Sequence, residues 1–228
     1  MTDESEPRDA QLLTSAQLRT PRAAAYAGIV FAVLTIVWMM LLQTSLPADP
    51  PTDPRWLTDD ETRVTVAVTL VPFAAIAFLW FIGVLRDLLG RREDQFFGTV
   101  FFGSGLLFVA GVFVWVGVVA AALVSSNAAP DRFAESTAYV FAGSMIEVLG
   151  TEVILRMFGV FMFSSATMWA RTRVMPRWLV IVTYVGALVL LIGGPVLGPV
   201  RMAIPVWVLV VSLTILIVRR RIAADLSD

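Results

Sequence analysis

Long apolar stretches separated by short polar segments dominate the chain. At 1.5 Å per residue, a helix needs about 20 apolar residues to cross about 30 Å of hydrocarbon. Six stretches approach or exceed that length: residues 23–43, 64–85, 96–124, 137–170, 178–191 and 202–218. A water-soluble core cannot bury so many unbroken apolar runs. The pattern predicts an all-α fold, a polytopic transmembrane bundle of six spans within one domain, residues 23–218.

The positions of the basic residues give this predicted bundle an orientation. Twelve of the 17 Arg residues lie in the two tails and in the second and fourth loops, whereas the other three loops hold four. Because cytoplasmic segments are enriched in basic residues, we expect both termini in the cytoplasm. Residues 1–22 then form a polar tail, and residues 219–228 form a short tail that is first basic and then acidic. The expected location is the plasma membrane, with the lipid bilayer as the principal partner.

Composition supports a membrane protein and excludes several kinds of chemistry. Hydrophobic residues make up 58% of the 228 residues, and the mean hydropathy is +0.81. The chain has no His, no Cys and no Lys, so it lacks the usual ligands of haem, iron–sulfur clusters and zinc, and has no Schiff-base lysine. We therefore expect no cofactor, no metal site and no catalytic residue. A net charge of −1 gives no reason to expect nucleic-acid binding, and Arg in place of Lys suggests a high-GC bacterial genome.

The fourth stretch is unusual because it is too long for a simple crossing and carries charges. It is either one long helix that projects outward or two pieces divided near Gly150. At 100° per residue, its polar side chains spread over about half of the helix circumference: Glu147, Thr151, Glu152 and Arg156. Charges at the membrane centre cost about 2.5–3.5 kcal/mol each on insertion scales, so they persist when they are paired, hydrated or functional. These four residues are the predicted ligand or ion site.

Two interpretations of this charged helix stay open at this point. Glu152 lies four residues before Arg156, which is the favourable order for an intrahelical ion pair, so the pair could simply lock helix packing. Alternatively, the pair could bind an anionic or polar ligand or relay a proton. Carboxylate-only metal chemistry through Glu147 and Glu152 is less favoured, since the two lie about 140° apart around the helix.

Small residues recur at seven-residue spacing in the third stretch. Gly103, Ala110 and Gly117 form this stripe, which Ala121 continues. Such stripes allow close, left-handed contact between membrane helices. We expect the stripe to pack against another helix of the same chain; a homo-oligomer or a partner membrane protein is the alternative.

Two parts of the sequence resemble known proteins. Thr151 to Arg156 partly resembles the Glu-Glu-x-x-x-Arg signature of CAAX-type intramembrane proteases, but Thr151 replaces the first Glu and that family's histidines are absent, which excludes the activity. The run from Arg86 to Phe108, with its Arg-Arg-Glu-Asp-Gln-Phe-Phe-Gly turn, resembles uncharacterised six-span actinobacterial integral membrane proteins. This resemblance implies a six-span fold and brings no activity or binding residue with it.

Three classes of function fit these observations to different degrees. The best supported is a non-enzymatic membrane protein that acts as an accessory, a scaffold or a small-ligand-binding unit. The alternative is a small transporter or channel with an outward-facing polar site around Glu152 and Arg156. An enzyme is the least supported class, because the residues for most catalytic constellations are missing. In each case we expect the working site in the outer half of the bundle, against the fourth stretch.

Overall fold

The computed structural model describes residues 23, 25–42, 61–89, 95–193 and 201–225. The first helix is Ala25–Leu42. The later elements follow in chain order: α3 (Glu61–Leu89), α4 (Gln95–Ala128), α5 (Pro130–Ala134), α6 (Thr137–Val148), η2 (Leu149–Val153), α7 (Ile154–Thr172), α8 (Arg177–Ile192) and α9 (Ala203–Asp225). No strand occurs within the described ranges. The predicted all-helical fold is confirmed for these residues, and the predicted tail over residues 1–22 lies outside them.

Three of the helices are long and apolar enough to cross a membrane: Ala25–Leu42, Glu61–Arg86 and Phe96–Ala128. Two further apolar helices are shorter, Arg177–Ile192 and Ala203–Ile217. The charged segment formed by α6, η2 and α7 is not in either group. Apolar helices of this length and number are compatible with a membrane location.

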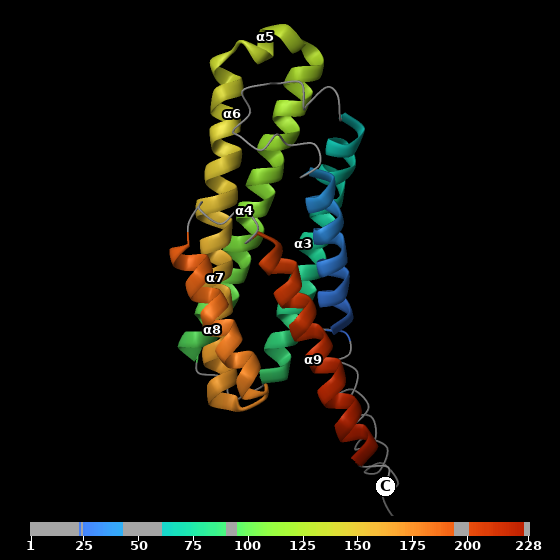
Figure 1. Ribbon diagram of the computed structural model, residues 1–228, viewed down its shortest axis with the longest axis vertical. Coiled ribbons are helices and arrows are strands. Elements are labelled where there is room, and N and C mark those ends of the chain that lie inside the picture. Colours follow the sequence, from blue (N-terminus) through green and yellow to red (C-terminus); the bar gives the residue numbers. More distant parts are fainter. Residues whose placement is uncertain (1–22, 24, 43–60, 90–94, 194–200, 226–228) are drawn as a thin grey trace, which may run out of the picture.

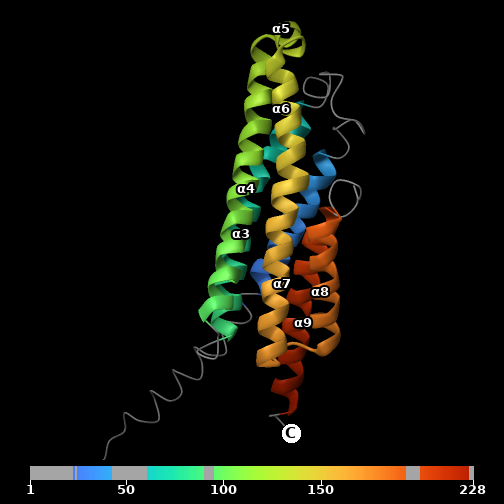
Figure 2. The same cartoon turned by 90° about the vertical axis from the view of Figure 1, so that its left-hand side faces the viewer.

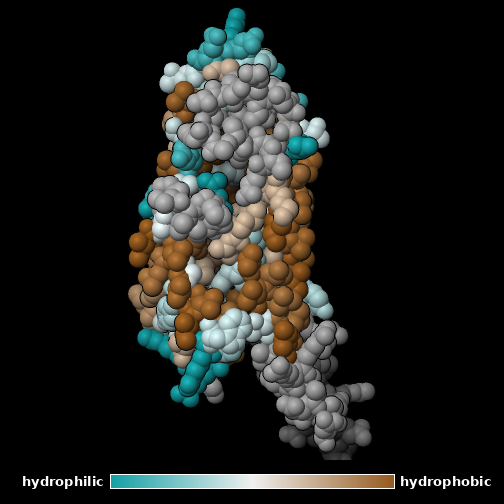
Figure 3. Space-filling model, viewed as in Figure 1, coloured by the Kyte–Doolittle hydropathy of each residue, from teal (hydrophilic) through white to brown (hydrophobic). Residues whose placement is uncertain are grey.

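The helices form an elongated bundle (Figures 1 and 2). Helix α4 runs along most of its length, and α6, η2 and α7 form one continuous ribbon beside it. The short α5 joins α4 to α6 at one end, beyond the ends of α8 and α9. In Figure 3 hydrophilic residues gather at the α5 end, while hydrophobic residues cover much of the body below it.

The fourth segment is a continuous helix with a π-helical turn at η2. Of the two expected forms, one long helix is confirmed, and Gly150 lies in the wide turn without breaking the helix. A π turn closes its hydrogen bonds over five residues, so a carbonyl in the adjoining turn loses its α-helical donor. Side chains add donors here: the Ile146 carbonyl accepts from the Leu149 N–H and also from Trp115 Nε1 at 2.9 Å, and Thr151 Oγ1 donates to the Glu147 carbonyl at 2.7 Å. The wide turn is thereby satisfied within the chain.

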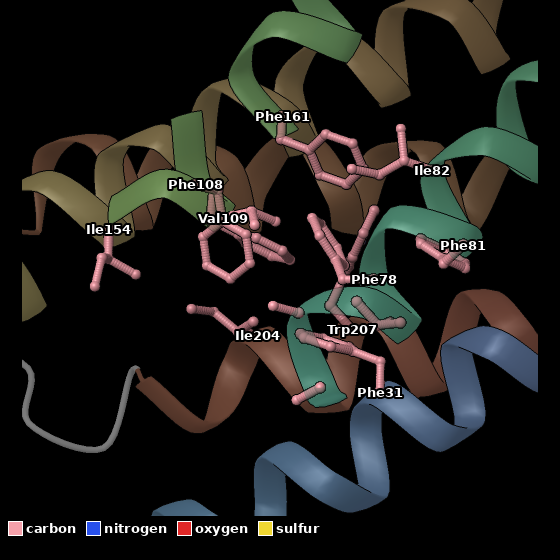
Figure 4. Packing of buried hydrophobic residues seen from close by; sticks show 14 of the residues in the cluster. Phe31, Phe78, Phe81, Ile82, Phe108, Val109, Ile154, Phe161, Ile204 and Trp207 are labelled. Atoms are coloured by element: carbon pink, nitrogen blue, oxygen red, sulfur yellow. The ribbon is translucent and has the colours of Figure 1, made fainter. Parts of the chain in front are cut away.

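Aromatic side chains connect the helices in the core (Figure 4). Phe78 of α3 lies 4.9 Å from Phe108 of α4 and 5.3 Å from Phe161 of α7, measured between ring centroids. Trp207 of α9 meets Phe158 of α7 edge to face at 5.6 Å. Pairs of this kind contribute about 0.5–1.5 kcal/mol beyond the area they bury. Four helices are therefore joined by one aromatic cluster.

The predicted packing of the small-residue stripe of α4 is wrong. A Cβ added at Gly103 or Gly117 would meet no atom within 4 Å, and Ala110 and Ala121 are exposed. The opposite face of α4 turns inward instead, because its large aromatic side chains bury more apolar surface there. Close approach occurs at Gly105, where a Cβ would lie 2.6 Å from Ile82 Cδ1.

Candidate ligand-binding cavity

The four residues of the predicted site lie together around η2. Glu152 and Arg156 form an intrahelical ion pair, as their spacing predicts. Both side chains are partly accessible on the flank of the bundle, 30% exposed for Glu152 and 45% for Arg156. Thr151 is buried and its hydroxyl bonds to the carbonyl of Glu147, whose own side chain is exposed. The pair therefore satisfies itself on one helix, and none of the four side chains contributes to the cavity described next.

A cavity of about 80 Å³ lies between the first helix, α3, α4, the η2–α7 segment and the start of α9. We call it the Thr35 cavity. Its lining is mostly apolar and consists of Phe31, Thr35, Trp38, Met39, Leu42, Val71, Ala74, Ala75, Phe108, Val109, Val112, Trp115, Gly150, Ile154, Leu155, Arg201 and Ile204. The fourth segment thus borders the cavity through residues other than those predicted.

Two tryptophans form one wall of the Thr35 cavity. Trp38 and Trp115 lie 5.6 Å apart between ring centroids. The indole of Trp115 is held in place by its bond to the Ile146 carbonyl next to the π turn. Gly150 makes room for this ring, since a Cβ there would lie 3.3 Å from Trp115 Nε1. The π turn therefore shapes the cavity by fixing the position of Trp115.

Thr35 has a buried hydroxyl without a hydrogen-bond partner, unlike many other hydroxyls in the helices. Serine and threonine in helices usually donate to the carbonyl four residues earlier. Ten side chains do so here: Thr69, Ser104, Ser144, Thr151, Ser164, Ser165, Thr167, Thr172, Ser212 and Thr214. Thr35 is only 3% exposed, and its Oγ1 has no hydrogen-bond partner. An unsatisfied buried hydroxyl costs about 1–3 kcal/mol, so this group is available to a bound molecule that supplies a partner.

Among the described residues that line the Thr35 cavity, Arg201 is the one that carries a formal charge. It lies just before α9 and is half-buried. No acidic side chain in the described part of the chain pairs with it. An Arg side chain stays protonated and cannot exchange protons near neutral pH. Thr35 and the two indoles are the other polar side chains of the described lining, so these residues can bind and orient a molecule.

Sequence reasoning missed both Thr35 and Arg201 for identifiable reasons. Thr35 is a single hydroxyl in an apolar helix, and most such hydroxyls bond to their own backbone. Arg201 reads as an ordinary loop arginine because it follows a glycine- and proline-rich connection. Only the packing of helices distant in sequence brings the two to one cavity. In the described residues, no group of three or more acidic side chains gathers to hold a metal ion.

Comparison with protein families, with curated proteins and with solved structures finds no match for this chain.

Proposed function

We propose that this chain is a non-enzymatic, six-span membrane protein that binds a small ligand in the Thr35 cavity. The observation that carries the proposal is the unpartnered Thr35 hydroxyl within an aromatic-walled cavity. Native proteins rarely leave a buried polar atom without a partner unless a ligand or water completes it. A purely structural scaffold has no need for such a cavity, so ligand binding is favoured over the scaffold role.

Helix length and Arg placement support six spans with both termini in the cytoplasm. Helix α9 has 23 residues and is about 35 Å long, and its apolar part, Ala203–Ile217, is about 22 Å long, so it crosses with its arginines at the interface if the bilayer thins locally. The segment from Thr137 to Thr172 spans about 54 Å and can also cross. Helix α8, with 16 residues, is about 24 Å long, a mismatch that local bilayer thinning and snorkelling of Arg177 can accommodate.

The placement of the charged pair gives no support to a transport route through Glu152 and Arg156. The two side chains pair with each other on the flank of the bundle, and neither lines the cavity. A structural role for the pair fits this geometry better, and we do not advance the transporter as a second candidate.

The topology can be tested without background labelling because the chain contains no cysteine. We would introduce one cysteine at a time, Asp131→Cys on α5 and Val174→Cys in the turn between α7 and α8. A membrane-impermeant maleimide applied to intact cells should label Asp131→Cys, and should label Val174→Cys only after permeabilisation. Labelling of both from outside, or of Val174→Cys alone, would contradict the proposed topology.

Ligand binding can be tested by filling the cavity. Ala75 lines it and is 4% exposed, whereas Ala110 lies on the exposed face of α4. The native protein, Ala75→Phe and the matched control Ala110→Phe would be purified from native membrane, and copurifying small molecules identified by mass spectrometry. We expect a compound that is present with the native protein and the control and absent with folded Ala75→Phe. Identical compounds in all three preparations would refute the proposal.

A further inference from the structure

We propose that the Thr35 cavity binds an anionic amphiphile, whose carboxylate or phosphate head is held by Arg201 and whose apolar body lies against the aromatic wall. Thr35 supplies a second, deeper donor to an oxygen of the same molecule. This inference rests on the proposed function and specifies the chemistry of its ligand.

The charge in the cavity lining selects for an anion. Arg201 is the one charged side chain of the lining and has no acidic partner among the described residues. Its planar guanidinium offers a fork of donors that matches carboxylate and phosphate oxygens. The described residues of the lining include no Asp or Glu that would attract a cation. A cationic ligand would therefore meet repulsion, and a neutral one would leave the guanidinium uncompensated.

The register between the first helix and α9 places the two donors at different depths. The helices run antiparallel, and Gly28 faces Ser212, whose Oγ would lie 2.0 Å from a Cβ at position 28. Thr35 is seven residues beyond Gly28, about 10 Å along the axis, and Arg201 is eleven residues before Ser212, about 16 Å. Arg201 thus lies about 6 Å further out than Thr35. Because Arg201 is half-buried and Thr35 fully buried, the head group belongs at Arg201 and the body beneath it.

The size and walls of the cavity suit a short hydrocarbon segment. At about 80 Å³ it has about half the volume of an apolar cavity of about 150 Å³ that binds benzene. The walls beneath Arg201 are the rings of Phe31, Trp38, Phe108 and Trp115. A chain end or a short acyl segment fits this space, whereas a large rigid molecule does not. An anionic head joined to an apolar chain could belong to a free carboxylate amphiphile or to an anionic phospholipid of the bilayer.

Matched probes can test this assignment on the full chain in phosphatidylcholine nanodiscs. Decanoate and its neutral counterpart decanol would be titrated, with changes in tryptophan fluorescence reporting binding. We expect decanoate to bind about tenfold more tightly or better, since hydrogen bonds to charged groups contribute about 1.5–3 kcal/mol. Arg201→Gln should abolish this preference and leave decanol binding unchanged, while Arg132→Gln on the exposed α5 should behave like the native protein. Decanoate carries no oxygen at the depth of Thr35, so Thr35→Val should leave its binding nearly unchanged.

The outcomes separate the ligand class from the proposed function. Equal binding of decanoate and decanol, or a preference that survives Arg201→Gln, would overturn the anionic assignment and leave a neutral apolar ligand. Absence of binding by either probe would also overturn it, while the copurification experiment decides the proposed function independently. Adding phosphatidylglycerol to the nanodiscs distinguishes the sources: competition with decanoate identifies a lipid head group, and its absence identifies a free amphiphile.

Discussion

Replacing Gly28 with Ala should break the contact between the first helix and α9. Gly28 is buried where these helices cross, and an added Cβ would lie 2.0 Å from Ser212 Oγ and 2.8 Å from Phe81 Cδ2. Neither neighbour can move away easily. Ser212 and Phe81 are both fully buried, and the Ser212 hydroxyl donates to the Val208 carbonyl at 2.7 Å. The single methyl group must therefore displace one of the helices.

The magnitude follows from two opposing terms. Alanine is better than glycine in a helix interior by about 1 kcal/mol, which favours the variant. Overpacking a core by one methyl group costs about 1–3 kcal/mol and occasionally more, and loss of the Ser212 hydrogen bond would add about 1 kcal/mol. We expect Gly28→Ala to lower the free energy of unfolding by about 1–3 kcal/mol. Gly117→Ala is the matched control, because no atom lies within 4 Å of its added Cβ, and it should gain up to about 1 kcal/mol.

The assay is denaturant unfolding of both variants in mild detergent, followed by circular dichroism. A second variant tests the cause, since Gly28→Ala combined with Ser212→Ala removes the nearest clashing atom and should recover part of the lost stability. If Gly28→Ala is as stable as Gly117→Ala, the first helix and α9 do not meet at this point. The conclusion that Arg201 lies further out than Thr35 uses this contact as its reference, so it would then be wrong as well.

Two further sets of substitutions test the surroundings of the π turn. Trp115→Phe keeps a ring against the cavity but removes the indole donor to the Ile146 carbonyl. We therefore expect the free energy of unfolding to fall by about 1–3 kcal/mol and hydrogen exchange to become faster over residues 149–153. The control Trp80→Phe, at a side chain 70% exposed, should change little. Unaltered exchange in Trp115→Phe would show that the indole does not hold the turn. For the ion pair, Glu152→Gln and Arg156→Gln should each be less stable than the double variant. The coupling energy between the two residues should be below about 1 kcal/mol, because both side chains are partly exposed. Strictly additive effects of the two substitutions would show that the residues do not interact.

The helical pattern was readable from the sequence because it depends on local properties. Each predicted stretch is a helix in the described residues, and the Glu152–Arg156 pair follows from their four-residue spacing. The orientation of α4 was not readable in the same way. A stripe of small residues signals close packing only when a neighbour occupies it, and the competing aromatic face of α4 buries more apolar surface. The prediction for Gly103 and Gly117 failed for that reason.

The cavity was not readable from the sequence because its parts are individually ordinary. Its two unpartnered polar residues, Thr35 and Arg201, are more than 160 positions apart. Charged residues within an apolar stretch predicted a ligand or ion site at Glu152 and Arg156, but in the structure these two side chains pair with each other. A satisfied pair is conspicuous in a sequence, whereas an unsatisfied hydroxyl becomes evident only when its neighbours are known. The predicted region was nevertheless close, since Gly150, Ile154 and Leu155 border the cavity.

The length of α4 sets a fixed height for α5. With 34 residues, α4 is about 51 Å long, whereas about 30 Å of helix fills the hydrocarbon. In the six-span arrangement we propose, most of the excess, about 20 Å, stands on the outer side, where α6 runs back beside α4. Two packed helices resist bending far better than a loop, so in this arrangement α4 and α6 would hold α5 at a set distance from the lipid. Removing seven residues from α4 and seven from α6 would lower it by about 10 Å and keep each helix facing the same way.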